Sequence, residues 1–181
     1  MIKLEISKRT HPIILSNMAN HYSKPRGFVG RNICYLISYD NLYYGSIVGG
    51  SATRFLPGRN EFLNITIDKL DKVVNNIFFH IDKIDGKYPC RNFGQMVLKR
   101  FRESIVVDWF NKYNDNVLGF DSLIEIPRTG EIYKRDGWTL VGQTKGFTCK
   151  RTKGKGTDSW TGKRVWDTNN IRPKLVFCKK I

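Results

Sequence analysis

The sequence predicts an α/β domain in which a mixed sheet packs on one long central helix and one short second helix. Three observations carry this prediction: an aromatic-rich hairpin in the first half, an amphipathic helix in the middle, and strands flanking a short helix behind it. The chain has 181 residues, of which 40% are hydrophobic and 13% aromatic. That is enough apolar material for one packed domain over 1–181, and it argues against a disordered chain.

Two runs of aromatic and β-branched residues, 33–39 and 42–48, predict the hairpin, because they flank the polar pair Asp40-Asn41. The run 49–52, Gly-Gly-Ser-Ala, predicts a bend or bulge where the backbone can approach another part of the chain closely. A third strand is expected at 76–82.

An apolar residue at every fourth position predicts the central helix, and charged residues lie between these positions. The apolar residues are Phe93, Val97, Phe101, Ile105 and Trp109. A turn-rich stretch, 85–94, precedes it, and Asn92 is the expected N-cap. Next come a strand at 117–126, a short helix around 130–136 that stops at Gly137, and a strand from Trp138. The expected order is therefore β-β-β-α-β-α-β.

Charge is the outlying property of the sequence. The chain has 31 Lys and Arg against 16 Asp and Glu, a net charge of +15, and its isoelectric point is about 9.8. Such an excess favours an anionic partner, and nucleic acid is the commonest one. The basic C-terminal segment, 145–181, holds eleven Lys and Arg against two acids. We expect six of its side chains to contact phosphate, the alternative being a solvated charge run: Lys150, Arg151, Lys153, Lys155, Lys163 and Arg164.

Several classes are not expected. No stretch approaches the ~20 apolar residues of a membrane-spanning helix, so no membrane partner is predicted. The first nine residues lack the apolar region of a secretory signal. Cys34, Cys90, Cys149 and Cys178 have no short spacing typical of a zinc or redox motif, so we expect reduced thiols and a cytoplasmic protein.

The stretch from Arg91 to Gln95 is an expected anion site, because it leads a strand into the N-terminus of a buried helix. With the later stretch from Tyr133 to Trp138, it resembles the GNAT acyltransferase superfamily. In that superfamily an Arg/Gln-x-x-Gly-x-Gly/Ala loop binds the pyrophosphate of the acyl carrier, and a Tyr on the next short helix lies near the leaving thiol. The resemblance assigns the carrier to Arg91, Asn92, Phe93, Gly94 and Gln95, and the thiol to Tyr133, whereas Met96 replaces the second small residue.

Longer blocks look like the Mom-like branch of that superfamily, over roughly residues 20–178. The blocks are 21–25 (His-Tyr-Ser-Lys-Pro), 44–52, 107–109, 133–146 and 163–167. Enzymes of this branch are phage-associated and convert the exocyclic amine of adenine in DNA to a carbamoylmethyl derivative, which protects the DNA from restriction. The resemblance therefore implies double-stranded DNA and an acyl-carrier cosubstrate as partners, in the cytoplasm of a bacterial host.

The same resemblance links an N-terminal His-Tyr pair and an acid on the strand after the central helix to iron and catalysis. These map onto His21, Tyr22 and either Asp121 or Glu125, which share a face of one strand because their spacing is even. With Tyr133 they form the expected catalytic set. Imidazole, phenolate and carboxylate would suit Fe(II), so His21, Tyr22 and Asp121 are the expected metal ligands. The donor is left open between acetyl-CoA and an aminoacyl-tRNA, and the oligomeric state is left open.

Two other functions are considered. One is a GNAT N-acetyltransferase that acts on a protein or small-molecule amine, and the other is a non-catalytic basic DNA-binding module. If the substrate is duplex DNA, adenine must be flipped out or single-stranded to be reached. The tyrosines of the hairpin and Trp138, Trp160 and Trp166 could stack on bases, or serve as ordinary packing residues.

Overall fold

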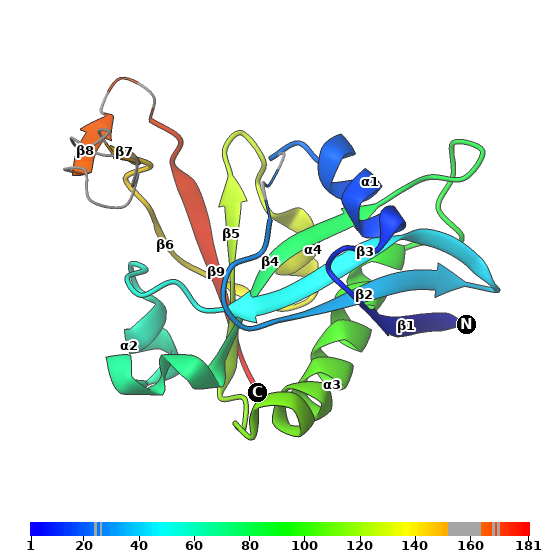
Figure 1. The fold of residues 1–181 in the computed structure, drawn as a ribbon, viewed down its shortest axis with the longest axis horizontal. Helices are drawn as coiled ribbons and strands as arrows, with labels where there is room; N and C mark the ends of the chain where they lie inside the picture. Colours follow the sequence, from blue (N-terminus) through cyan, green and yellow to red (C-terminus); the bar gives the residue numbers. More distant parts are fainter. Residues whose placement is uncertain (24, 26, 152–163, 168, 170) are drawn as a thin grey trace.

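A seven-stranded mixed sheet forms the centre of the described part of the chain (Figure 1). The computed structural model describes residues 1–23, 25, 27–151, 164–167, 169 and 171–181. The sheet order is β1 (Ile2–Ser7), β2 (Asn32–Tyr39), β3 (Leu42–Ser51), β4 (Val73–Ile81), β5 (Gly119–Glu125), β9 (Lys174–Lys180) and β6 (Thr139–Gln143). Only β4 and β5 pair in parallel among these neighbours. A separate ladder joins β7 (Thr148–Arg151) to β8 (Arg164–Asp167).

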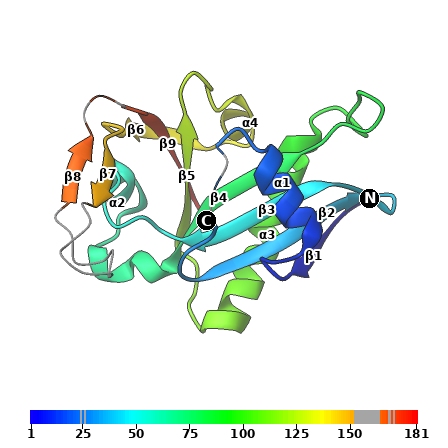
Figure 2. The ribbon, with the colours of Figure 1, turned by 45° about the horizontal axis from the view of Figure 1, so that its top comes forward.

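Helices cover both faces of the sheet (Figure 2). One face carries α3 (Phe93–Tyr113) and the short α4 (Glu131–Arg135). The other carries α1 (Pro12–Asn20) and α2 (Arg59–Leu63), which a 3-10 turn, η1 (Ile67–Lys72), follows. The predicted mixed sheet with a long and a short helix is confirmed. None of the helices in the described ranges is long and apolar enough to cross a membrane.

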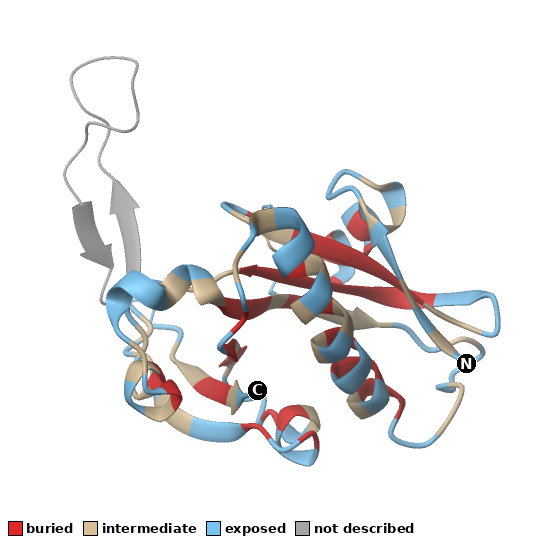
Figure 3. Ribbon diagram, turned by 90° about the horizontal axis from the view of Figure 1, so that it is seen from below, coloured by how far each residue is buried: buried red, intermediate tan, exposed pale blue. Residues whose placement is uncertain are grey.

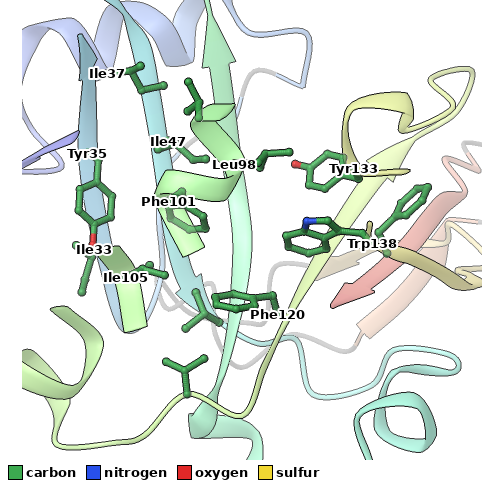
Figure 4. Packing of buried hydrophobic residues seen from close by; sticks show 14 of the residues in the cluster. Ile33, Tyr35, Ile37, Ile47, Leu98, Phe101, Ile105, Phe120, Tyr133 and Trp138 are labelled. Carbon is green, nitrogen blue, oxygen red and sulfur yellow. The ribbon is translucent and has the colours of Figure 1, made fainter. Parts of the chain in front are cut away.

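The hairpin and the central helix lie where the sequence predicts them. Asp40 and Asn41 both have positive φ angles, as a type I′ turn between β2 and β3 requires. The five apolar residues spaced four apart in α3 are all buried, and they pack on β2, β3 and β5 (Figures 3 and 4). The α3 stripe therefore forms the main core of the sheet.

Gly49, near the end of β3, makes room for α3, as the predicted close approach requires. A Cβ on Gly49 would lie 2.1 Å from Ile105 Cδ1 and 3.1 Å from Phe101 Cζ. The β3–β4 register also shifts between Val48 and Gly49, but the bulge is in β4 and not at the predicted residues 49–52. In β4 this shift leaves Ile77 without a register partner in β3.

The predicted order of elements lacks β1, α1, α2, η1, β7, β8 and β9. The largest difference lies in the basic C-terminal segment, where β9 inserts between β5 and β6 instead of forming a charged tail. Val176, Phe177 and Cys178 of β9 are buried, and the basic residues stand at its ends. An apolar run this short is easily hidden in a sequence by the lysines around it.

Candidate active site

The parallel strands β4 and β5 separate after a short contact, and a cavity lies between them. They pair only from Val73 with Gly119 to Asn75 with Asp121, and both continue beyond that point (Figure 1). The cavity has a volume of about 670 Å³. The turn after α1, the second halves of β4 and β5, and the segment 127–133 line it, together with Thr53, Tyr88 and Lys174. Its size is within the usual range for a small-molecule site.

Tyr133 is held in the cavity wall by a buried network. Its hydroxyl donates a hydrogen bond to Asn76 Oδ1 at 2.6 Å, and Ser122 Oγ donates to the backbone carbonyl of Asn76 at 3.1 Å. The ring packs against Trp138 and Phe177, with its hydroxyl directed away from α4 (Figure 4). Burial raises the pKa of Tyr133 above its usual value, so the phenol is protonated at neutral pH.

Asn76 joins this network to the bulge in β4. Its amide nitrogen donates to the carbonyl of Val48 at 3.2 Å and to the carbonyl of Phe78 at 3.1 Å. These bonds hold the backbone on both sides of Ile77, which also lines the cavity. The Asn76 side chain therefore holds both the backbone of the bulge and the hydroxyl of Tyr133 in position.

His21 and Tyr22 lie together at the cavity, where α1 ends. His21 is the C-cap residue of α1, and its extended backbone turns the chain out of the helix. Its ring centroid lies 4.1 Å from that of Tyr22 and 4.7 Å from that of Phe78. Across the cavity, the guanidinium carbon of Arg128 lies 3.4 Å from the centroid of the Tyr22 ring. This stack brings the turn after α1 next to the turn after β5.

The His21 imidazole is neutral near pH 7. Burial lowers its pKa to about 4, and the nearby His80 contributes in the same direction. The backbone N–H of Ser23 donates to His21 Nδ1 at 3.2 Å, and Ser23 Oγ lies 2.8 Å from the same nitrogen. The neutral ring therefore carries its hydrogen on Nε2 and accepts hydrogen bonds at Nδ1.

This low pKa predicts a pH-dependent loss of stability. Between about pH 6.5 and 4 the unfolded chain binds a proton at His21 and the folded chain does not, so the free energy of unfolding falls as the pH falls. We expect the His21 contribution to this loss to reach roughly 2–3 kcal/mol at pH 4.5. Urea unfolding of the natural protein and His21→Gln at pH 7 and pH 4.5 measures it, since the difference between the two proteins cancels every other titrating group. Equal losses in both proteins would contradict the buried neutral ring.

The structure separates the two candidate acids. Glu125 lines the cavity, and its charge acts on Tyr22. Asp121 does not line the cavity: it is fully buried beneath α2, and its Oδ2 accepts a hydrogen bond from Arg59 Nη1 at 3.0 Å. Both acids are on one face of β5, as expected, but four residues along a strand separate them by about 13 Å.

The predicted iron ligands His21, Tyr22 and Asp121 are therefore not brought together. Asp121 is bound to Arg59 instead. Within the described ranges, no three His, Cys, Asp or Glu side chains form a group that could hold a metal ion. Burial also raises the pKa of Tyr22, which disfavours the phenolate that a metal would need. The donor set of this structure does not fit Fe(II).

The predicted carrier loop begins α3 but does not line the cavity. Arg91 and Asn92 are exposed, and no acid lies in the first turn of the helix, so this end is open to an anion. Asn92 stands at the N-cap, as expected, but has a φ of 61° and makes no capping bond with its side chain.

The next three residues of this loop, 93–95, contact other parts of the protein and do not face an open site. Phe93 is a core residue that packs on Tyr44. A Cβ on Gly94 would lie 2.2 Å from Ile132 Cδ1, so this glycine serves the contact between α3 and α4. Gln95 Nε2 donates to the carbonyl of Arg135 at 2.8 Å. A carrier would therefore meet the exposed backbone and Arg91 here, and not these side chains.

The structure describes the backbone of only three of the six residues that we expect to contact phosphate. Lys150 and Arg151 belong to β7, and Arg164 belongs to β8. Lys153, Lys155 and Lys163 lie outside the described residues. The assignment of these six side chains to DNA stays a prediction.

Three residues of the site carry no signal in the sequence: Asn76, Ser122 and Arg128. An Asn or a Ser within a strand carries no signal that distinguishes a buried network from a surface position. Arg128 follows the strand's closing Ile126-Pro127 pair and reads as part of a loop. Only the separation of β4 from β5 gives these residues a common cavity.

The described fold is similar to those of solved GNAT acetyltransferases over the whole chain. A GNAT family acetyltransferase from Elizabethkingia anophelis with acetyl-CoA bound has a TM-score of 0.58 at 11% identity, covering 99% of this chain and 98% of that one. A Bacillus subtilis acetyltransferase in complex with CoA also has 0.58, at 9% identity, with 100% and 99% covered. The IAA acetyltransferase from Bacillus cereus has 0.54 at 11% identity, with both chains fully covered. No family model matches the sequence. No curated protein matches it either. The chain has the GNAT fold.

Proposed function

We propose that the protein is an N-acyltransferase whose reaction takes place in the cavity between β4 and β5. The observation that carries this proposal is the separation of the two strands around Tyr133, a proton donor held at the cavity wall. Two similar structures contain acetyl-CoA or CoA, which supports a thioester of this kind as donor. The open N-terminal end of α3, with Arg91, supports binding of the anionic part of the carrier.

The chemistry follows from the groups around the cavity. The amine nitrogen of the acceptor attacks the thioester carbonyl, the carbon–sulfur bond breaks, and Tyr133 gives its proton to the departing thiolate. Backbone groups at the β4 bulge beside Ile77 can polarise the carbonyl oxygen. The proton lost by the amine can pass through Ser23 Oγ to neutral His21 Nδ1, 2.8 Å away.

For the acceptor, we propose the exocyclic amine of adenine in DNA, which the step above converts to an N-acyl adenine. Such an amine is conjugated with the ring and needs help in losing its proton, which a neutral imidazole supplies. The net charge of +15 supports a polyanionic acceptor. The stack of Arg128 on half-exposed Tyr22 supports a flat base at the cavity mouth. The resemblance to the Mom-like branch points the same way.

A second candidate is acetylation of an amine on a protein. It is favoured by similar structures whose acceptors are proteins, among them the ribosomal-protein-S18-alanine N-acetyltransferase from Escherichia coli, with a TM-score of 0.53 at 9% identity. This candidate uses the same donor chemistry and differs only in the acceptor. A non-catalytic DNA-binding module would give Tyr133, Asn76 and Ser122 only their structural role in the core.

Expression in bacteria, followed by digestion of host DNA to nucleosides and mass spectrometry, tests the acceptor. A living host supplies both acetyl-CoA and aminoacyl-tRNA, so the test does not depend on which of the two is the donor. We expect a new deoxyadenosine derivative, whose mass separates a carbamoylmethyl from an acetyl product. The derivative should be absent with the matched His21→Ala/Tyr22→Phe variant. Unmodified host DNA, together with acetylation of a peptide amine by the purified protein, would overturn the DNA acceptor in favour of the second candidate.

A further inference from the structure

The segment from Thr53 to Gly58, which joins β3 to α2, displays an aromatic side chain to solvent next to the cavity. Thr53 lines the cavity, and Phe55 follows two residues later with 71% of its surface exposed. The guanidinium carbon of Arg54 lies 5.3 Å from the centroid of the Phe55 ring. An isolated exposed phenylalanine is common on protein surfaces. Here it lies beside an arginine at the edge of the candidate active site, and we call these two residues, Arg54 and Phe55, the tip of the segment.

The backbone of this tip is fixed from below by Arg59. The Arg59 side chain is fully buried, and it donates hydrogen bonds to the carbonyls of Thr53 and Arg54 and to Asp121 Oδ2. Burying a charged pair costs several kcal/mol unless its hydrogen bonds are well satisfied. The hydrogen bonds from Arg59 hold the carbonyls of Thr53 and Arg54, the two residues that precede Phe55. The backbone on the cavity side of the tip is therefore held in place.

The far end of the segment is fixed against β6. A Cβ on Gly142 would lie 2.8 Å from the carbonyl oxygen of Pro57. Gly58 has a φ of +73°, and a Cβ there would lie 2.1 Å from the carbonyl oxygen of Val141. The segment thus contacts the sheet at both ends, while the side chains of Arg54 and Phe55 remain exposed between them.

We propose that Phe55 is a wedge that enters the base stack of duplex DNA and fills the space left by the adenine in the cavity. This inference rests on the proposed DNA acceptor. Unstacking one base from a duplex costs a few kcal/mol, and proteins that distort DNA often offset this cost with an inserted apolar side chain. Arg54 stands beside the wedge, where its charge fits a neighbouring phosphate. The part of the segment before the buried Arg59, 52–58, contains Arg54 and no acid.

A wedge matters only when the target base is stacked and paired, and this makes the proposal testable. Three DNA substrates with one sequence are compared: a duplex with adenine paired, the same adenine in a single strand, and a duplex with the adenine opposite an abasic site. We expect Phe55→Ala to slow modification of the paired adenine by about tenfold or more, and to leave the other two substrates within about twofold. Phe55→Trp should keep most of the activity.

Phe110→Ala is the matched control, because Phe110 is also exposed but belongs to α3 on the other face of the sheet. A second readout does not need the chemistry: 2-aminopurine in place of the target adenine becomes fluorescent when the base leaves the stack. The natural protein should raise this fluorescence in the duplex, and Phe55→Ala should not.

The two proposals fail in different ways. If the natural protein modifies none of the three substrates, the DNA acceptor is wrong. If it modifies all three and Phe55→Ala slows them equally, or slows none, the acceptor stands and the wedge is overturned.

Discussion

Tyr133→Phe is expected to slow acyl transfer by roughly 10²- to 10⁴-fold while the protein stays folded. The variant removes one oxygen, and with it the proton that the leaving thiolate requires. The stability cost should be limited to the lost hydrogen bond to Asn76, about 1 kcal/mol. The rate is measured as thiol release from the thioester with duplex DNA as acceptor, and urea unfolding measures the stability.

Tyr113→Phe is the control for this experiment. Its hydroxyl also donates one hydrogen bond, here to the backbone carbonyl of Asn32 at 2.9 Å, but it lies at the end of α3 and does not line the cavity. This variant should lose a comparable amount of stability and keep its rate. A Tyr133→Phe protein with nearly the natural rate would show that the leaving group takes its proton from elsewhere.

Arg59→Met is expected to destabilise the folded protein by about 3–5 kcal/mol at pH 7, the largest stability effect that we foresee. The variant leaves the Asp121 carboxylate buried without its partner, and Asp121 Oδ1 already has no hydrogen-bond partner within the described residues. Burial raises the pKa of Asp121 to about 6 even with Arg59 present. The folded protein therefore binds more protons than the unfolded chain above pH 3.8, and stability falls as the pH rises through this range.

Without Arg59 the pKa of Asp121 should rise further, so the penalty should extend above pH 6 and be smaller at pH 5 than at pH 7. Urea unfolding at both pH values measures this difference. The double variant Arg59→Met/Asp121→Asn removes the charge as well and should recover most of the loss. A penalty that is the same at both pH values and that Asp121→Asn does not relieve would show that Arg59 stabilises through its contacts with Thr53 and Arg54 alone.

The parts of the fold that the sequence predicts well are those in which burial repeats at a regular spacing. The stripe from Phe93 to Trp109 identifies α3, and Asp40-Asn41 identifies the hairpin turn. The C-terminal strand β9 has too few apolar residues among its lysines to show such a pattern. Its place between β5 and β6 depends on pairing across the sheet, which no local pattern contains.

The candidate site is predicted in part, for a related reason. His21, Tyr22, Glu125 and Tyr133 do line one cavity. Asp121 has the same spacing and chemistry as an active-site acid, and only the position of Arg59 on α2 makes it a structural partner. Asn76, which holds both Tyr133 and the bulge, can be found only after the strand register is known.

A crystal structure with coenzyme A tests the central claim most directly, namely that acyl transfer takes place between β4 and β5. We expect the sulfur of coenzyme A to lie in the cavity within hydrogen-bond distance of the Tyr133 hydroxyl, with the phosphates toward Arg91 at the start of α3. A coenzyme bound with its sulfur outside this cavity, away from Tyr133, would contradict the account.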